Sequence, residues 1–160
     1  MRQCGVEGTN MAARTIYLIK RLEAAIRLML EKELRDLDLT PAQYTTLSML
    51  AANGETSSSD LARRVLVTPQ SMSEMIKALD RKALIRRRES ETNRKVLDIA
   101  LSPAGKALLE KAEARVDAME AALFAALEGD EVDRLRDYLG TVLSQDRATR
   151  GKKAGRARAA

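Results

Sequence analysis

Two neighbouring groups of polar side chains in this 160-residue chain have the types and spacing for hydrogen-bond and charge recognition. The first group holds short polar side chains that could donate to or accept from base edges in a DNA groove: Gln70, Ser71, Ser73, Glu74 and Lys77. The second group is basic, and its charges suit phosphates and the narrow minor groove: Arg86, Arg87, Arg88, Arg94 and Lys95.

Other kinds of chemistry find little support in the composition. The chain has no His and one Cys, so it lacks the common zinc ligand sets, a Ser/His/Asp arrangement and an imidazole acid or base. Cys4 precedes the first periodic segment, where the pocket that a sensor thiol needs is not expected. Glycine-rich phosphate loops, transmembrane runs and a signal peptide are absent. We therefore expect a cytoplasmic protein that is not an enzyme, with no metal, no cofactor and no membrane partner.

The first polar group needs a helix to hold it, and the surrounding sequence predicts two short helices joined by a turn. Ser57 lies three residues before Asp60, which is the spacing of an N-terminal capping pair. Thr68-Pro69 begins the second helix, because Thr caps well and Pro suits the first helical position. Opposite the polar group lies a stripe expected to face the core: Met72, Met75, Ile76 and Leu79. By itself, such a polar face is more often a plain solvated surface, and the residues that follow favour the DNA-contacting interpretation.

The second group needs a hairpin, which the following residues predict. Lys95 to Leu101 alternates with period two, and its Leu97, Ile99 and Leu101 are expected to face the core. Ile85 to Glu89 would be the partner strand, and a loop from Ser90 to Arg94 would join the two. The basic side chains then lie along the first strand and near the tip of the loop. A solubilising basic turn is the alternative.

From Leu39 to about Gly105 the chain resembles the MarR type of bacterial transcription regulators. The resemblance rests on the segments LTPAQYTTLSML, DLARRVLVTPQSMSEMIKALDRKALIRR and ESETNRKVLDIALSPAG. It implies a mainly α fold with a small β-wing, in which a winged helix-turn-helix DNA-binding lobe is joined to long terminal helices that form a dimerisation region. It also implies a recognition helix at about Pro69 to Ala83 in the major groove, a wing arginine matching Arg94 in the minor groove, and an obligate homodimer.

Three positions depart from the family pattern. The wing tip has Asn93 where the family often has Asp, so an ion pair that would orient a basic partner is missing. Glu74 stands where a basic residue is common, and it would repel phosphate yet could accept from a cytosine amino group. Ala83 replaces the usual Gly before the first wing strand, which affects helix termination. The resemblance therefore predicts DNA binding better than it predicts the operator sequence.

Long amphipathic helices are expected on both sides of the winged region. One covers Thr15 to Leu37, and a second opens at Thr40-Pro41 and stops near Asn53-Gly54. A third opens at Ser102-Pro103 and is expected to run without a breaker to Leu127, and a last one covers about Asp130 to Asp146.

The apolar stripes of these helices exceed what the winged region could cover, so we expect them to pair with a second copy. Intramolecular core is the alternative. A symmetric pair must hold two recognition helices about 34 to 36 Å apart, which predicts a pseudo-palindromic operator in double-stranded DNA. The expected dimer-interface residues are Ile19, Leu22, Ile26, Val116, Met119, Leu123, Leu135, Leu139 and Val142.

Positive charge is concentrated in two parts of the chain. Residues 61–100 carry ten basic and five acidic side chains, and residues 147–160 carry six basic and none acidic, while the whole chain is +5. A DNA-binding surface requires such a concentration. The basic tail is expected to be disordered, either as a plain solvated end or as an additional salt-sensitive attraction for DNA. The expected organisation is a disordered N-terminus (1–10), a dimerisation helix (11–38), the winged region (39–101), dimerisation helices (102–147) and the tail (148–160).

The family resemblance also implies a small, often phenolic or aromatic and anionic effector, bound where the dimer helices meet the winged lobe. Tyr17, Arg21 and Tyr44 are the candidate residues there, although Tyr44 could be plain core. A ligand that prefers a non-binding separation of the two lobes would release DNA. The leading hypothesis is thus a homodimeric, sequence-specific, ligand-released repressor. The alternative is a helical dimer that uses the winged fold to bind protein without specific DNA binding.

Overall fold

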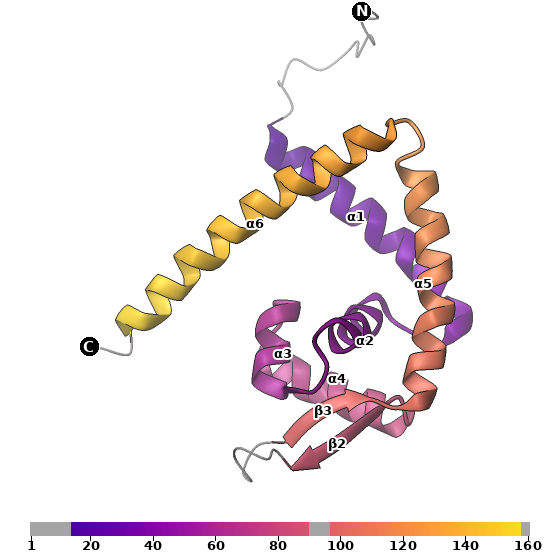
Figure 1. Ribbon diagram of the computed structural model, residues 1–160, viewed down its shortest axis with the longest axis vertical. Coiled ribbons are helices and arrows are strands. Elements are labelled where there is room, and N and C mark those ends of the chain that lie inside the picture. Colours follow the sequence, from indigo (N-terminus) through magenta and orange to yellow (C-terminus); the bar gives the residue numbers. More distant parts are fainter. Residues whose placement is uncertain (1–13, 90–96, 158–160) are drawn as a thin grey trace, which may run out of the picture. The chain divides into compact units, whose positions relative to one another are not determined.

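The computed structural model describes residues 14–89 and 97–157. The chain divides between Met119 and Glu120 into two compact units. The first unit contains nearly all of the helices and strands, and the second contains the last helix (Figure 1). In chain order the elements are α1 (Thr15–Leu34), the 3-10 turn η1 (Arg35–Leu37), α2 (Pro41–Asn53), β1 (Thr56–Ser57), α3 (Ser58–Val65), α4 (Pro69–Arg81), β2 (Ile85–Glu89), β3 (Leu97–Leu101), α5 (Pro103–Leu123) and α6 (Gly129–Ala157).

Side-chain caps define where the helices of the winged region begin. The Thr40 side chain accepts from the Gln43 N–H at 3.2 Å, and the Gln43 side chain accepts from the Thr40 N–H at 3.2 Å, which closes a capping box ahead of α2. Ser57 and Thr68 cap α3 and α4 in the predicted manner. The capping and proline signals therefore confirm the three helix starts that the sequence predicts.

The hairpin predicted for the second polar group forms part of a small antiparallel sheet. Within the described residues the strand order is β1-β3-β2. Ile85 pairs with Leu101 and Arg87 with Ile99, while Thr56 pairs with Ile99 from the other side. Ile99 and Leu101 are buried, as the period-two pattern predicts. Strand β1 was not predicted, because two residues are too few to show a period.

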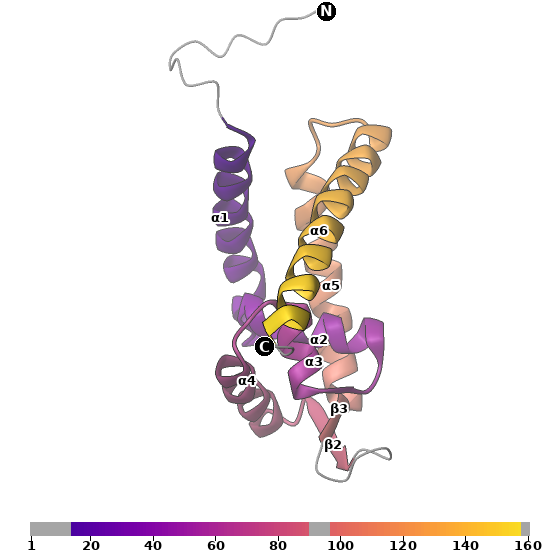
Figure 2. The same cartoon turned by 90° about the vertical axis from the view of Figure 1, so that its left-hand side faces the viewer.

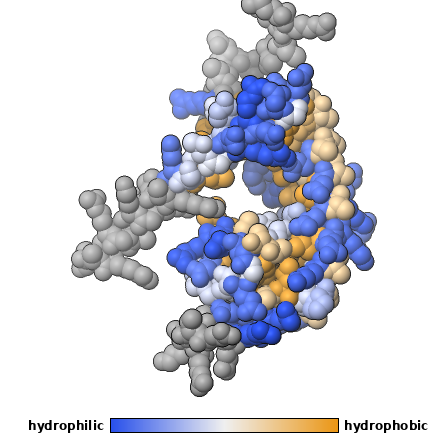
Figure 3. All heavy atoms as spheres, viewed as in Figure 1, coloured by the Kyte–Doolittle hydropathy of each residue, from blue (hydrophilic) through white to orange (hydrophobic). Residues whose placement is uncertain are grey.

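A single hydrophobic core joins α2, α3, α4 and the sheet, and the end of α1 and the start of α5 complete it. Figures 1 and 2 both show the three short helices gathered beside the hairpin, with α1 leading away from them. On the face drawn in Figure 3, hydrophilic side chains gather at the hairpin end of this unit, and apolar ones lie between α2 and α5. The fully buried large side chains are Leu34, Leu47, Leu50, Leu61, Met72, Leu79 and Thr46.

Three predicted boundaries are wrong. Helix α5 ends at Leu123 and not at Leu127, because the backbone there tightens into turns, with the Leu127 N–H bonded to the Phe124 carbonyl at 2.9 Å. An apolar pattern cannot reveal such a change, since the apolar residues continue through it. Helix α4 ends at Arg81, and Ala83 lies outside it with φ 55°.

The third correction concerns the tail. Helix α6 continues to Ala157, so the segment after residue 147 is helical where we expected disorder. Ala, Lys and Arg are strong helix formers, and extending an existing helix is far easier than starting one. We expected disorder because the segment has no apolar period, but that absence indicates only that a segment lacks a buried face. The expected disordered N-terminus, residues 1–10, lies outside the described residues.

Candidate nucleic-acid interface

Helix α4 separates a buried face from a polar one. Met72, Ile76 and Leu79 are buried in the core, and Met75 is half-buried beside them. The hydroxyl of buried Thr46 on α2 contacts the Met75 sulfur, which fits α4 closely against its neighbour. The predicted polar residues all lie exposed on the rest of the helix surface: Gln70, Ser71, Ser73, Glu74 and Lys77. The helix is thus held from one side and leaves short polar side chains free to contact another molecule.

The N-terminus of α4 is fixed by its cap. Thr68 Oγ1 accepts from the Ser71 N–H at 3.1 Å and shares a hydrogen bond with the Ser71 hydroxyl at 2.9 Å. The Ser71 hydroxyl therefore takes part in the cap, whereas the side chains of Gln70 and Ser73 are exposed. The cap sets the direction in which these side chains leave the first turn.

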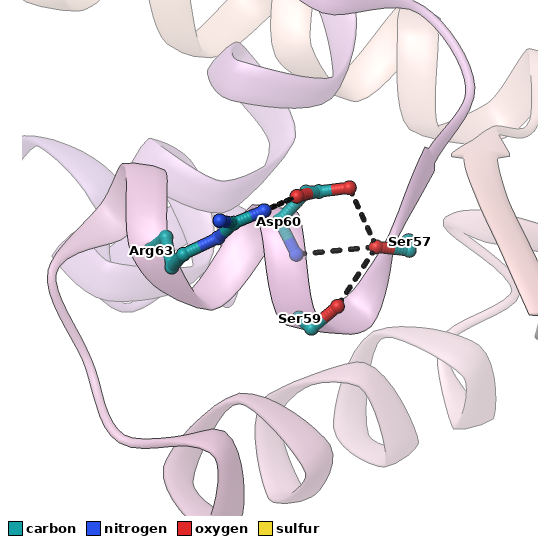
Figure 4. A network of polar contacts seen from close by, with 4 residues as sticks. All are labelled: Ser57, Ser59, Asp60 and Arg63. Carbon is teal, nitrogen blue, oxygen red and sulfur yellow. Dashed lines mark hydrogen bonds and ion pairs between the residues drawn. The ribbon is translucent and has the colours of Figure 1, made fainter. Parts of the chain in front are cut away.

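Helix α3, which supports α4, is held by a network of four residues at its N-terminus (Figure 4). The Ser57 hydroxyl accepts from the Asp60 N–H at 3.2 Å, donates to the Asp60 carboxylate at 2.8 Å and lies 3.0 Å from the Ser59 hydroxyl. Arg63 forms an ion pair with the other Asp60 oxygen. One of these bonds satisfies a free backbone donor, the Asp60 N–H, at the start of a helix of only eight residues, and the others hold the capping side chains in place. The short helix can therefore keep its orientation under α4.

The three consecutive arginines of β2 do not form one cluster. Residues of a strand alternate between faces, so Arg87 shares a face with buried Ile99, while its two neighbours lie on the other face. Arg87 forms a 2.9 Å ion pair with Asp80 of α4, and its side chain is 31% exposed. Arg88 is 67% exposed and lies 3.8 Å from Glu55. Of the remaining basic wing residues, Arg86 donates to the Leu101 carbonyl at 3.3 Å, and Arg94 and Lys95 lie outside the described residues.

Arg87 and Asp80 thus join the hairpin to α4, a positioning role that the sequence did not predict. The arginine run indicated positive charge but not the face of each side chain. The register of β2 against β3 supplies that information, because it sets Arg87 on the same side as the core.

The joint between α4, the hairpin and α5 is closely packed. The Ser102 N–H bonds to the Leu84 carbonyl at 3.1 Å, and the Ser102 hydroxyl donates to the Ala83 carbonyl at 2.7 Å and accepts from the Gly105 N–H at 2.9 Å. A Cβ at Gly105 would lie only 2.0 Å from the Leu84 oxygen. The start of α5 therefore fits directly against the residues that follow α4.

Two cations fasten the segment between α1 and α2. Lys82, directly after α4, forms a 2.8 Å ion pair with Asp38. Arg115 of α5 donates to the Glu33 carbonyl at 2.9 Å and lies 3.6 Å from the Asp36 carboxylate. The same short segment thus contacts both α5 and the end of the recognition element.

The expected dimer-interface residues occupy several kinds of surroundings. Val116 packs partly against the core of its own chain, so at that position intramolecular packing applies. Ile19 on α1 and Leu139 and Val142 on α6 are exposed. The others are half-buried: Leu22, Ile26, Met119, Leu123 and Leu135. Further exposed apolar residues on the same two helices were not predicted, although their helical spacing indicates them: Ile16, Leu18, Tyr138 and Leu143.

The three effector candidates are not brought together within one chain. Tyr17 and Arg21 lie exposed in the first turns of α1. Tyr44, on α2, is half-buried against the core that includes Leu34 at the other end of α1, and at the rise of an α-helix Leu34 lies about 25 Å from Tyr17. A cleft of about 320 Å³ in the same unit is lined by other residues: Glu31, Arg35, Asp38, Leu39, Thr40, Pro41, Gln43 and Lys82.

In the parts of the chain that the structure describes, no three His, Cys, Asp or Glu side chains converge on a possible metal position. Among the same residues, no helix is both long and apolar enough to cross a membrane.

Comparisons with known proteins agree with this geometry. The model of the MarR family matches residues 37–95. The HTH-type transcriptional repressor Rv2887 of Mycobacterium tuberculosis is 33% identical over 128 residues, which cover 78% of this chain and 92% of the relative. The structure of the transcriptional repressor CouR bound to a 23-mer DNA duplex is 25% identical, with a TM-score of 0.76, and covers 85% of this chain and 99% of its own. A Staphylococcus aureus MepR–DNA complex is 26% identical, with a TM-score of 0.72, over 81% and 96% of the two chains.

Proposed function

The chain belongs to the MarR family of transcription regulators, and on this premise we propose that it is a homodimeric repressor that binds a pseudo-palindromic operator in double-stranded DNA. Family membership makes it a DNA-binding transcriptional repressor rather than an enzyme. The homodimer, the operator geometry, the response to an effector and action in the cytoplasm are the parts that we propose.

The observation that carries the proposal is the divided surface of α4. Its apolar face packs against the core, while its first three turns expose Gln70, Ser73, Glu74 and Lys77. Short polar side chains on a rigid helix suit hydrogen bonding to base edges in the major groove. Glu74 would accept from a cytosine amino group and disfavour other bases at that position.

The hairpin would supply sequence-independent contacts. Arg86 and Arg88 share the face of β2 that points away from the core, and Arg94 and Lys95 follow in the sequence. These groups would bind phosphates, with Arg94 in the minor groove. Arg87 would hold the hairpin against α4 through Asp80 and so set the distance between the two DNA contacts.

The proposed homodimer is supported by apolar surface that a single chain leaves exposed. Ile16, Leu18 and Ile19 on α1 are exposed large apolar residues, and so are Leu139 and Val142 on α6. Large apolar side chains exposed in such number on a helix are typical of an interface. Two copies joined through these helices would present two α4 helices to successive major grooves, which is why we propose a pseudo-palindromic operator.

We further propose that a small aromatic anion releases the protein from DNA by preferring a different separation of the two α4 helices. Arg21 offers a positive charge and Tyr17 an aromatic ring on the exposed part of α1. Because Tyr44 lies far from both along one chain, the dimer would have to supply the remaining surface. A thermal-shift screen of aromatic acids tests this part, and loss of operator binding must accompany any stabilisation.

The test of the DNA-binding proposal begins with selection of bound sequences from random duplex DNA. Affinity for the selected duplex should fall steeply with added salt, because bound counterions are released from the phosphates. Arg94→Ala should cost roughly 1 to 3 kcal/mol of binding free energy, whereas Gln70→Ala or Ser73→Ala should change base preference. Lys111→Ala, at an exposed position on α5, is the matched control and should leave both unchanged. Salt-insensitive binding, or an Arg94→Ala variant that binds like the wild type, would refute the proposal.

A further inference from the structure

Helix α6 changes its character twice along its length. In its first two turns every described arginine forms ion pairs. Arg134 pairs with Asp130, and Arg136 pairs with both Asp133 and Glu120, at 2.9 Å in each case. The hydrogen bond to Glu120, followed by that to Asp133, raises the pKa of Arg136. Charge in this part of the helix is therefore used for contacts within the chain.

The middle of the helix, residues 138–145, has no charged residue. Its large apolar side chains are exposed, with Tyr138 at 69%, Val142 at 63% and Leu143 at 56%. This part suits the protein interface proposed above, and the apolar residues end with it.

The last part reverses the charge balance. After Asp146, residues 147–160 contain six basic side chains and no acidic one, and the helix continues through Ala157. At the rise of an α-helix, the stretch from Gln145 to Ala157 extends the charge about 18 Å beyond the apolar part. Asp146 is the last acidic residue of the sequence, so beyond it basic residues are no longer interleaved with acidic ones as they are in the first turns.

The composition of this basic segment excludes several kinds of partner. It has no Val, Leu, Ile or Met, so it lacks the apolar face with which a helix lies on a membrane or enters a protein groove. It has no aromatic residue on which single-stranded bases could stack. Its other residues are chiefly Ala and Gly, which let a basic helix approach a phosphate backbone closely. Duplex DNA is the partner that fits charge without apolar or aromatic surface.

We propose that residues 147–157 form a helical arm that binds the phosphate backbone of duplex DNA independently of sequence. This inference rests on the proposed function, because it assigns a second DNA contact to the same regulator. In a homodimer the arm would occur twice and would raise affinity for any duplex long enough to reach it.

The test uses the full-length protein and a mixed-sequence duplex of about 30 base pairs, roughly three helical turns, that lacks the selected operator. The variant K152Q/K153Q/R156Q removes three charges and keeps helix-forming residues. Its control, K20Q/K32Q/K111Q, removes three exposed charges from α1 and α5. Each phosphate contact contributes about 0.9 to the slope of log affinity against log salt, so the arm variant should lower that slope by about 2 to 3 per protomer. The control and the charge-retaining variant K152R/K153R/R156K should keep the wild-type slope.

Equal slopes for the arm variant and the control would overturn the inference. The inference would also be overturned if the arm variant lost as much affinity for a single-stranded 30-mer as for the duplex. It would be overturned as well if the variant lost affinity only for phosphatidylcholine vesicles that contain phosphatidylserine. Failure of the proposed function has a different signature, because it appears as absent preference for any selected duplex and as an Arg94→Ala variant without effect. A change in the slope on mixed-sequence DNA depends on neither result.

Discussion

Replacing Gly105 by Ala should be the most damaging small substitution in the winged unit. The added Cβ would lie 2.0 Å from the Leu84 carbonyl oxygen and 2.9 Å from its carbon. Non-bonded heavy atoms settle at about 3.5 Å, so α5 and the residues after α4 must separate by roughly 1.5 Å. Both obstructing atoms belong to the backbone, and no side-chain rotation can remove the clash.

The size of the effect follows from the contacts at this joint. The obstructing Leu84 oxygen also accepts from the Ser102 N–H, and Ser102 in turn accepts from the Gly105 N–H. Overpacking typically costs about 1 to 3 kcal/mol, and each weakened hydrogen bond about 0.5 to 1.5 kcal/mol. A helical Gly→Ala change returns about 0.5 to 1 kcal/mol. We therefore expect Gly105→Ala to lower the free energy of unfolding by about 2 to 4 kcal/mol.

Urea unfolding at one fixed protomer concentration measures this change, since association would otherwise alter the apparent stability. Gly140→Ala is the matched control, because Gly140 lies within α6 and nothing lies within 4 Å of the position of its added Cβ. That substitution should be neutral or stabilising by up to about 1 kcal/mol. If Gly105→Ala unfolds at the same urea concentration as the wild type, the close packing of this joint is refuted.

Two further substitutions test the ends of α4. Ala83→Gly should raise the unfolding free energy by about 0.5 to 1 kcal/mol, because Ala83 has φ 55°, a conformation that costs an L-residue about 1 to 2 kcal/mol and glycine little. Destabilisation of this variant in a thermal melt would contradict the expectation. The control Ala78→Gly, inside the helix, should lower the unfolding free energy. Thr68→Ala removes the 3.1 Å bond to the Ser71 N–H and should cost about 1 kcal/mol of stability together with DNA affinity. Thr68→Ser retains the hydroxyl oxygen and should retain both stability and DNA affinity. If Thr68→Ser loses as much as Thr68→Ala in thermal melts and binding titrations, Thr68 does not act as a cap.

Local signals in the sequence predicted the parts of the fold that depend on neighbouring residues. Thr40, Ser57 and Thr68 each cap the helix that was expected to begin there. The 3.6-residue period placed Met72 and Ile76 inside and Gln70 and Ser73 outside. These features are predictable because a cap or a helical face involves residues that lie within a few positions of one another.

The features that the sequence did not predict depend on distant partners or on weak local preferences. Strand β1 exists because Thr56 and Ser57 pair with residues more than 40 positions later. Arg87 differs from its two neighbours because of its register against Ile99. The ends of α5 and α6 were misplaced because an apolar period indicates burial, and these helix ends are not set by burial.

Sequence alone therefore determined that a polar-faced helix and a basic hairpin stand next to each other, together with the family that this order resembles. Tertiary structure decided how the two are joined: Asp80 binds Arg87 across the gap between them, and Gly105 admits the Leu84 carbonyl at the start of α5. The physical reason is that capping and periodicity act within a few residues, whereas ion pairs across elements and close backbone contacts exist only after distant segments have packed together.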